Sequence, residues 1–193
     1  HGMAYVLPTA IVDIMLEAYM GFNFAYAKQF LKELDPYNLR WAEELLLPDE
    51  IHNFSKLRQY TDIPLSGGEH EFTRFGFYDL LKTEALDIFQ FDTNRVGGFT
   101  EAQKICTMAQ MNGVEVIPHG GQMHNLHVVM SSFASPMAEY FPKTEIEVGN
   151  EMFWYIFDGE AVAENGRLQL DDHKPGVGLT LKTEGLENFN IVE

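Results

Sequence analysis

The stretch ALDIFQFDTNRVGGFTEAQKICTMAQMNGVEVIPHG, residues 85–120, places a helical pattern between two short apolar runs. The runs at 85–92 and 114–120 have the length and the β-branched or aromatic content of buried strands. Between them, residues 99–112 begin with a Thr-Glu pair and end before an Asn-Gly pair, which is typical of a helix start and stop. Strand, helix and strand in this order predict a parallel βαβ unit.

The same alternation extends in both directions from this unit. Further strands are predicted at 12–17, 39–44, 63–69 and 135–141, and helices near 23–34, 49–59 and 73–83. Residues 121–134 are predicted to form a loop and a short helix. We therefore expect an α/β fold of the TIM-type (β/α) barrel class, in which parallel strands alternate with helices.

Each predicted strand ends with an acid or a histidine. The intervals between these residues are 20 to 27, which is the spacing of βα units in a barrel of ~250 residues. The carboxyl ends of barrel strands meet at one mouth, where the active site lies. The sequence therefore predicts one site formed by Glu17, Glu43, Glu69, Asp92, His119 and Glu139.

Six units do not close an eight-stranded barrel, and residues 1–11 are too short to supply the first two. We expect either breaks in the chain path, most readily within the first dozen residues, or completion by another chain; the breaks are favoured. Residues 1–145 are predicted to form the barrel units. Residues 146–193, rich in Gly-containing turns, are predicted to form short strands and turns.

Composition restricts the function classes. The formal net charge of −16 argues against nucleic acid or an anionic membrane surface as a partner. No apolar run approaches the ~20 residues that span a bilayer. The single cysteine, Cys106, excludes an internal disulfide and lies in an apolar helical stretch, so a buried thiol in a reduced, cytoplasmic setting is expected.

The predicted site has the residues for metal-assisted proton abstraction. Three carboxylates on consecutive strands, Glu17, Glu43 and Glu69, are the hard oxygen ligands that Mg²⁺ prefers. Asp92 behind His119 would set the tautomer of the imidazole and raise its basicity, as a general base requires. These groups suit removal of a proton next to a carboxylate.

Four segments resemble successive barrel segments of the enolase superfamily, of the mandelate racemase and muconate lactonising type. They are RWAEELLLPDE (40–50), PLSGGEHEFTRFGF (64–77), DIFQFDTNRVGGFTEAQKI (87–105) and VIPHGGQMHN (116–125). The run GEHEFTR-x-GF and the later PHG resemble the L-rhamnonate dehydratases in particular. The likeness covers roughly residues 12–181.

The resemblance implies a role for each site residue. Glu17, Glu43 and Glu69 would bind Mg²⁺, and Asp92 and His119 would form the catalytic dyad. Glu139 would hydrogen-bond the enediolate oxygen, and His70 would contact the substrate. The N-terminal α+β capping domain of the family is not recognisable in this chain, and residues 146–193 would return toward it.

The implied reaction is dehydration of an acid sugar, an aldonate such as L-rhamnonate, to a 2-keto-3-deoxy acid by a hydro-lyase. His119 would abstract the α-proton and could return it to the departing 3-hydroxyl. Two residues depart from the family pattern: Glu17 stands where Asp is usual, and Leu45 where Pro is usual. We expect a small acid sugar as ligand and a homo-oligomer.

Two alternatives stay open. One is a racemase or a different acid-sugar dehydratase of the same superfamily. The other is an inactive barrel that acts as a binding subunit, which Glu17 and Leu45 would favour. Among the remaining polar residues, His124 and His127 are expected in helix capping or water contacts and Arg74 in an ion pair. The aromatic cluster MFWYIF (152–157) is expected to pack as a strand.

Overall fold

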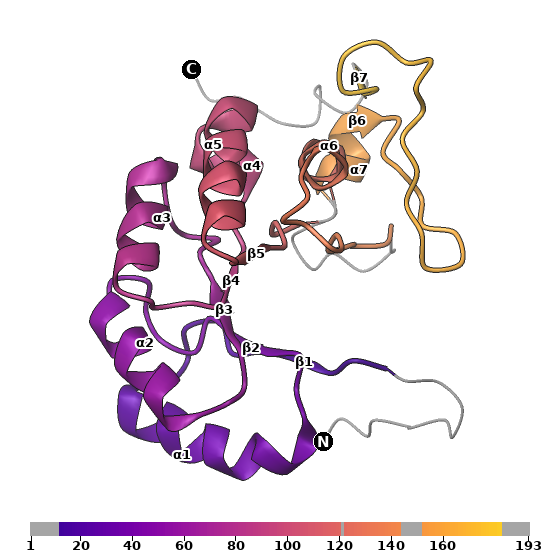
Figure 1. Ribbon diagram of the computed structural model, residues 1–193. Coiled ribbons are helices and arrows are strands. Elements are labelled where there is room, and N and C mark those ends of the chain that lie inside the picture. The colour runs from indigo at the N-terminus through magenta and orange to yellow at the C-terminus, as the bar shows by residue number, and fades with distance from the viewer. Residues whose placement is uncertain (1–11, 121, 144–151, 183–193) are drawn as a thin grey trace, which may run out of the picture. The chain divides into compact units, whose positions relative to one another are not determined.

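The computed structural model describes residues 12–120, 122–143 and 152–182 (Figure 1). Five strands form one sheet in chain order: β1 (Met15–Glu17), β2 (Trp41–Glu43), β3 (Leu65–Gly67), β4 (Ile88–Phe89) and β5 (Glu115–Val116). Helices α1 (Phe24–Leu34), α2 (Ile51–Leu57), α3 (Thr73–Lys82), α4 (Thr93–Val96) and α5 (Gly98–Met111) connect them. This confirms the predicted alternation of parallel strands and helices.

The contacts within the chain divide it into two compact units. The N-terminal unit comprises the described residues 12–67 and 79–88. The C-terminal unit comprises the described residues among 68–78 and 89–182.

In the N-terminal unit, β1 pairs with β2 and β2 with β3, all parallel. Asn23 is the N-cap residue of helix α1, and its side chain accepts a 3.0 Å hydrogen bond from the Tyr26 amide. Helix α1 contacts α2, and the 3₁₀ turns η1 (Asp35–Tyr37) and η2 (Arg58–Tyr60) follow them (Figure 1). The fully buried side chains of this unit include Leu31, Leu57 and Leu65.

In the C-terminal unit, three phenylalanines form the centre of the core. The ring of Phe77 packs edge-on against Phe89 and Phe91, with centroids 5.1 and 5.8 Å apart. All three side chains are fully buried. Gly68, which follows β3, has a φ of +110°, and a Cβ there would lie 2.8 Å from the Phe77 ring. Only glycine fits this approach to the core.

The rest of this unit consists of short elements. They are α6 (Met123–Ser131), α7 (Met152–Ile156), β6 (Phe157–Asp158) and β7 (Thr180–Leu181), of which β6 and β7 pair antiparallel. Glu164 and Arg167 pair across a turn in which Asn165 and Gly166 both have positive φ. This is the conformation that an Asn-Gly pair favours in a hairpin.

Two predictions about secondary structure are wrong. Residues 135–141 form no strand, although Val116 donates a backbone hydrogen bond to Ala134 just before them. Pro136 lacks the amide hydrogen that a strand ladder needs at that position. Residues 152–156 are helical rather than extended, and only Phe157 of the aromatic cluster lies in a strand.

Two other predictions lie outside the described residues: a break within the first dozen residues and a domain boundary near residue 145. The division at residue 145 therefore stays a prediction. Among the residues that the structure describes, no helix is long and apolar enough to cross a membrane.

Candidate functional site

His119 follows β5 in a backbone position set by β4. The amides of Ile117 and His119 donate to the carbonyls of Phe89 and Phe91, at 2.9 and 3.0 Å. These two bonds, two residues apart on both segments, continue the pairing of β4 and β5 beyond their formal ends. His119 is thereby held next to Asp92, the residue that follows Phe91.

His119 and Asp92 form a buried dyad. Nδ1 of His119 lies 3.2 Å from Oδ2 of Asp92, and both residues are less than a tenth exposed. Burial disfavours the imidazolium, but the Asp92 hydrogen bond and the charges of Glu69 and Glu139 outweigh it and raise the pKa of His119. Burial likewise opposes the Asp92 carboxylate, yet hydrogen bonds from His119 and Asn94 lower the pKa of Asp92.

Asp92 is also the N-cap residue of helix α4. Its Oδ1 accepts from the amide and from the side chain of Asn94, at 2.8 and 3.0 Å. Oδ1 therefore caps the helix while Oδ2 faces His119, which fixes the carboxylate in one orientation.

The other ring nitrogen of His119 faces Glu69. Nε2 lies 3.3 Å from Oε2 of Glu69, whose Oε1 lies 3.1 Å from the Arg95 guanidinium. Arg95 also donates to the Glu69 carbonyl at 3.2 Å, and its Nε lies 3.7 Å from Asp92. Nε2 of His70 lies 3.5 Å from Oε1 of Glu69. Arg95 thus links the dyad acid to the predicted metal ligand.

Glu139 lies close to His119 in the same unit. Its carboxylate accepts a hydrogen bond from the amide of Gly120, the residue after His119. Of the predicted site residues, the structure brings together within the C-terminal unit Glu69, His70, Asp92, His119 and Glu139.

Glu17 and Glu43 belong to the N-terminal unit. They are register partners on β1 and β2, and neighbouring residues in a parallel pair project to the same face. Glu43 is buried and accepts a 3.0 Å hydrogen bond from the Trp41 indole. Glu17 is exposed and accepts from the Tyr19 amide.

The donor chemistry suits Mg²⁺. Glu17, Glu43 and Glu69 offer carboxylate oxygens only, which are hard ligands of the kind that this cation takes. Glu43 and Glu69 are both buried, which restricts the freedom of their side chains as ligands. Over the described ranges, no group of three or more His, Cys, Asp or Glu side chains is gathered as a metal site.

Two polar residues of this unit were not predicted from the sequence as parts of the site. Arg95 stands three residues after Asp92, one helical turn away, which is a spacing that allows contact. Asn125 is a buried amide in a largely apolar helix, six residues after His119. In the sequence, the available signal was an Asn within an apolar helical segment shortly after His119.

The remaining polar candidates contact residues outside the predicted site. Arg74 forms an ion pair with Glu101, as expected. Nε2 of His127 lies 3.2 Å from the carbonyl of Val177. Burial lowers the pKa of His124, whose ring lies beside Phe99.

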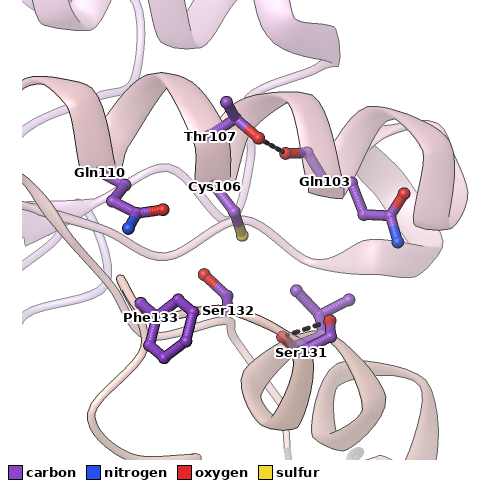
Figure 2. A pocket seen from close by; sticks show the side chains of 8 residues that line it. Gln103, Cys106, Thr107, Gln110, Ser131, Ser132 and Phe133 are labelled. Carbon is purple, nitrogen blue, oxygen red and sulfur yellow. Dashed lines mark hydrogen bonds between the residues drawn. The ribbon is translucent and has the colours of Figure 1, made fainter.

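Cys106 lies away from this site, in a pocket of about 250 Å³ between α5 and the end of α6 (Figure 2). None of the predicted site residues lines that pocket. The thiol is buried, as expected, and burial raises its pKa, which disfavours the reactive thiolate.

Comparison with known proteins places this geometry in a family. Residues 6–185 match the family described as "Enolase C-terminal domain-like". The chain belongs to this family. The resemblance to the enolase superfamily is therefore confirmed.

Its relatives include named dehydratases. The chain is 34% identical over 177 residues to an L-rhamnonate dehydratase of Saccharopolyspora erythraea, covering 89% of this chain and 44% of that protein. Among solved structures, it is similar to the L-rhamnonate dehydratase of Gibberella zeae, with a TM-score of 0.79 and 30% identity over 90% of this chain and 45% of the other.

A third relative was solved with a metal. The L-talarate dehydratase of Polaromonas sp. JS666, complexed with Mg and L-glucarate, has a TM-score of 0.77 and 27% identity, covering 91% of this chain and 46% of the other. The chain thus spans slightly less than half the length of these relatives.

Proposed function

We propose that the complete protein is a Mg²⁺-dependent hydro-lyase that dehydrates an acid sugar, an aldonate such as L-rhamnonate, to a 2-keto-3-deoxy acid. The observation that carries the proposal is the buried His119–Asp92 dyad, in which Nδ1 of His119 meets Asp92 and Nε2 faces Glu69. Membership of the enolase C-terminal family and the likeness to named L-rhamnonate dehydratases support the choice of reaction.

In the proposed mechanism His119 is the general base. Asp92 accepts the Nδ1 proton, so the lone pair of Nε2 is available to remove the α-proton of the sugar acid. The resulting enediolate expels the 3-hydroxyl as the C2=C3 double bond forms, and His119 can return its proton to that leaving group as water. The enol that remains tautomerises, gaining a proton at C3 as its hydroxyl proton is lost, and gives the 2-keto-3-deoxy acid. Glu139 accepts a hydrogen bond from the Gly120 amide next to the base, and in its protonated form it would donate a hydrogen bond to the enediolate oxygen.

Glu17, Glu43 and Glu69 would hold the cation. Mg²⁺, when bound, would supply positive charge to the substrate carboxylate and to the enediolate. Within the C-terminal unit, His70 lies against Glu69 and would contact the substrate. Arg95 would keep Glu69 and Asp92 oriented through its contacts with both.

A screen of acid sugars with Mg²⁺ tests this proposal. The complete protein should form a 2-keto-3-deoxy product from at least one aldonate, and should exchange the substrate α-hydrogen with deuterated solvent. Exchange with epimerisation but no keto product would point to the racemase alternative. Absence of both exchange and Mg²⁺ binding would point to the inactive barrel. Size-exclusion chromatography tests the expected homo-oligomer.

A further inference from the structure

Asn125 is a buried polar side chain that the proposed mechanism does not use. It lies on α6, is 1% exposed, and has the buried apolar residues Leu126 and Val128 near it in sequence. An amide in such surroundings is costly unless its hydrogen bonds are made. Both ends of this amide are bonded, and all but one of their partners belong to the segments that follow β4 and β5 and carry the dyad.

The oxygen of the Asn125 amide is bonded to the β4 side. Oδ1 accepts from the backbone amide of Thr93 at 3.1 Å and from the Thr93 hydroxyl at 2.5 Å. Thr93 is the residue directly after Asp92 and is itself 2% exposed. The Asn125 oxygen therefore holds the backbone that carries the dyad carboxylate.

The nitrogen of the same amide is bonded to the β5 side. Nδ2 donates to the carbonyl of His119 and, at 3.3 Å, to the carbonyl of Gly120. A third contact joins it to Oε1 of Gln122 at 3.4 Å. All partners of the nitrogen are acceptors and all partners of the oxygen are donors, so the amide has one orientation that satisfies both ends.

We propose that Asn125 is a positioning residue that sets the separation of His119 and Asp92. It joins the backbone next to Asp92 to the backbone of His119 through one rigid, planar group. The dyad contact of 3.2 Å is at the long end of the hydrogen-bond range, so a small displacement would break it. This inference rests on the proposed function for its catalytic meaning, but the dyad geometry can be measured without turnover.

The test replaces Asn125 with Asp, which has the same shape, in the complete protein with saturating Mg²⁺. Asn125→Asp keeps an acceptor for Thr93 and removes the donor to the His119 and Gly120 carbonyls. Asn112→Asp is the matched control, because the Asn112 amide donates to the Met108 carbonyl at an exposed helix end. The first readout is the proton resonance of His119 Nδ1, assigned by its absence in His119→Asn.

Asn125→Asp should shift or broaden this resonance, whereas Asn112→Asp should leave it unchanged. Turnover should fall by about 10- to 100-fold, the range expected for a displaced catalytic group. KM for the sugar and the affinity for Mg²⁺ should change little, because Asn125 is placed in neither binding role. A folded Asn125→Asp protein with an unchanged resonance and unchanged kcat, or with only KM altered, would overturn the inference.

Thr93→Val is the second variant and decides the question if Asn125→Asp does not fold. It removes the hydroxyl bond to Asn125 and keeps the backbone bond, so kcat should fall about fivefold with a smaller shift of the His119 resonance. Thr107→Val is its control, since the Thr107 hydroxyl donates to the Gln103 carbonyl within α5. A Thr93→Val protein indistinguishable from this control would also overturn the inference.

The two proposals fail in different ways. If the unaltered protein dehydrates no acid sugar, the proposed function is wrong, while the His119 resonance still reports whether Asn125 sets the dyad. If the unaltered protein is active and both Asn125→Asp and Thr93→Val match their controls, only the positioning role is wrong.

Discussion

The two ring nitrogens of His119 face two different carboxylates. Nδ1 meets Asp92 at 3.2 Å and Nε2 meets Glu69 at 3.3 Å. The two nitrogens therefore differ in role: Nδ1 is held by the carboxylate that caps α4, and Nε2 is directed at a predicted metal ligand. Substitutions of these three residues should therefore have distinguishable effects.

Replacement of His119 should greatly reduce turnover and leave the protein folded. His119→Asn should lower turnover by on the order of 10²–10⁴-fold, the contribution of a positioned general base. Exchange of the substrate α-hydrogen should disappear, while Mg²⁺ affinity measured by calorimetry should persist. His52→Asn, the same change at an exposed histidine, is the control. Near-normal dehydration by His119→Asn would assign the base to another residue.

The pKa of His119 also predicts how stability depends on pH. Its folded-state pKa is raised above the ordinary 6.5, so the protonated form is favoured in the metal-free folded protein. The stability that His119 contributes is then fully present below about pH 6.5 and is lost as the pH rises through the raised pKa.

Metal-free unaltered protein and His119→Asn should be unfolded by denaturant across this pH range. The difference in unfolding free energy should be largest on the acidic side and shrink on the alkaline side. A difference that grows with rising pH would show that the surroundings of His119 disfavour the imidazolium.

At the scale of elements, the turn after β3 connects the sheet to Glu69. Gly68 in this turn has a φ of +110°, and its α-carbon faces the Phe77 ring. The position of Glu69 therefore depends on a backbone conformation that L side chains rarely adopt.

Gly68→Ala should destabilise the complete protein by about 2 kcal/mol, because it adds both backbone strain and a clash with Phe77. Gly113→Ala separates the two causes. Gly113 also has a positive φ, of +70°, but a Cβ there would meet nothing within 4 Å, so the loss should be about 1 kcal/mol. Urea unfolding measures both. Equal losses would mean that the Phe77 ring yields to the added methyl.

At the scale of the whole molecule, the chain spans less than half of each dehydratase relative. Its five parallel strands follow the barrel order, and its predicted ligands come from both compact units. If the folded protein binds Mg²⁺ and the unfolded chain does not, the free energy of binding adds to the stability of the complete protein.

Mg²⁺ at 100 times its Kd should stabilise the complete protein by about 2.7 kcal/mol. Glu69→Gln should reduce this gain and also lower turnover, unlike His119→Asn, which should keep the gain. Glu101→Gln, which removes a carboxylate that pairs with Arg74, is the control for loss of charge. Thermal unfolding with and without Mg²⁺ measures the gain. An undiminished gain in Glu69→Gln would remove Glu69 from the ligand set.

The alternation of parallel strands and helices can be predicted from the sequence, because hydrophobic periodicity and helix end signals are local. The helix predicted at 99–112 is α5, and the strand that precedes His119 is β5. The acids and the histidine at successive strand ends could also be predicted to share one site, since the carboxyl ends of parallel strands lie on one side. That pattern predicted the residues of the dyad.

Only the three-dimensional contacts reveal which polar groups hold the dyad in place and that residues 135–141 form no strand. Arg95 reaches Glu69 across 26 residues of sequence, and Asn125 reaches Thr93 across 32. No local pattern encodes such contacts, because they depend on how helices pack onto strand ends. Residues 135–141 resemble a strand in composition, but a strand also needs backbone amides that donate to the neighbouring ladder, and Pro136 has no amide hydrogen.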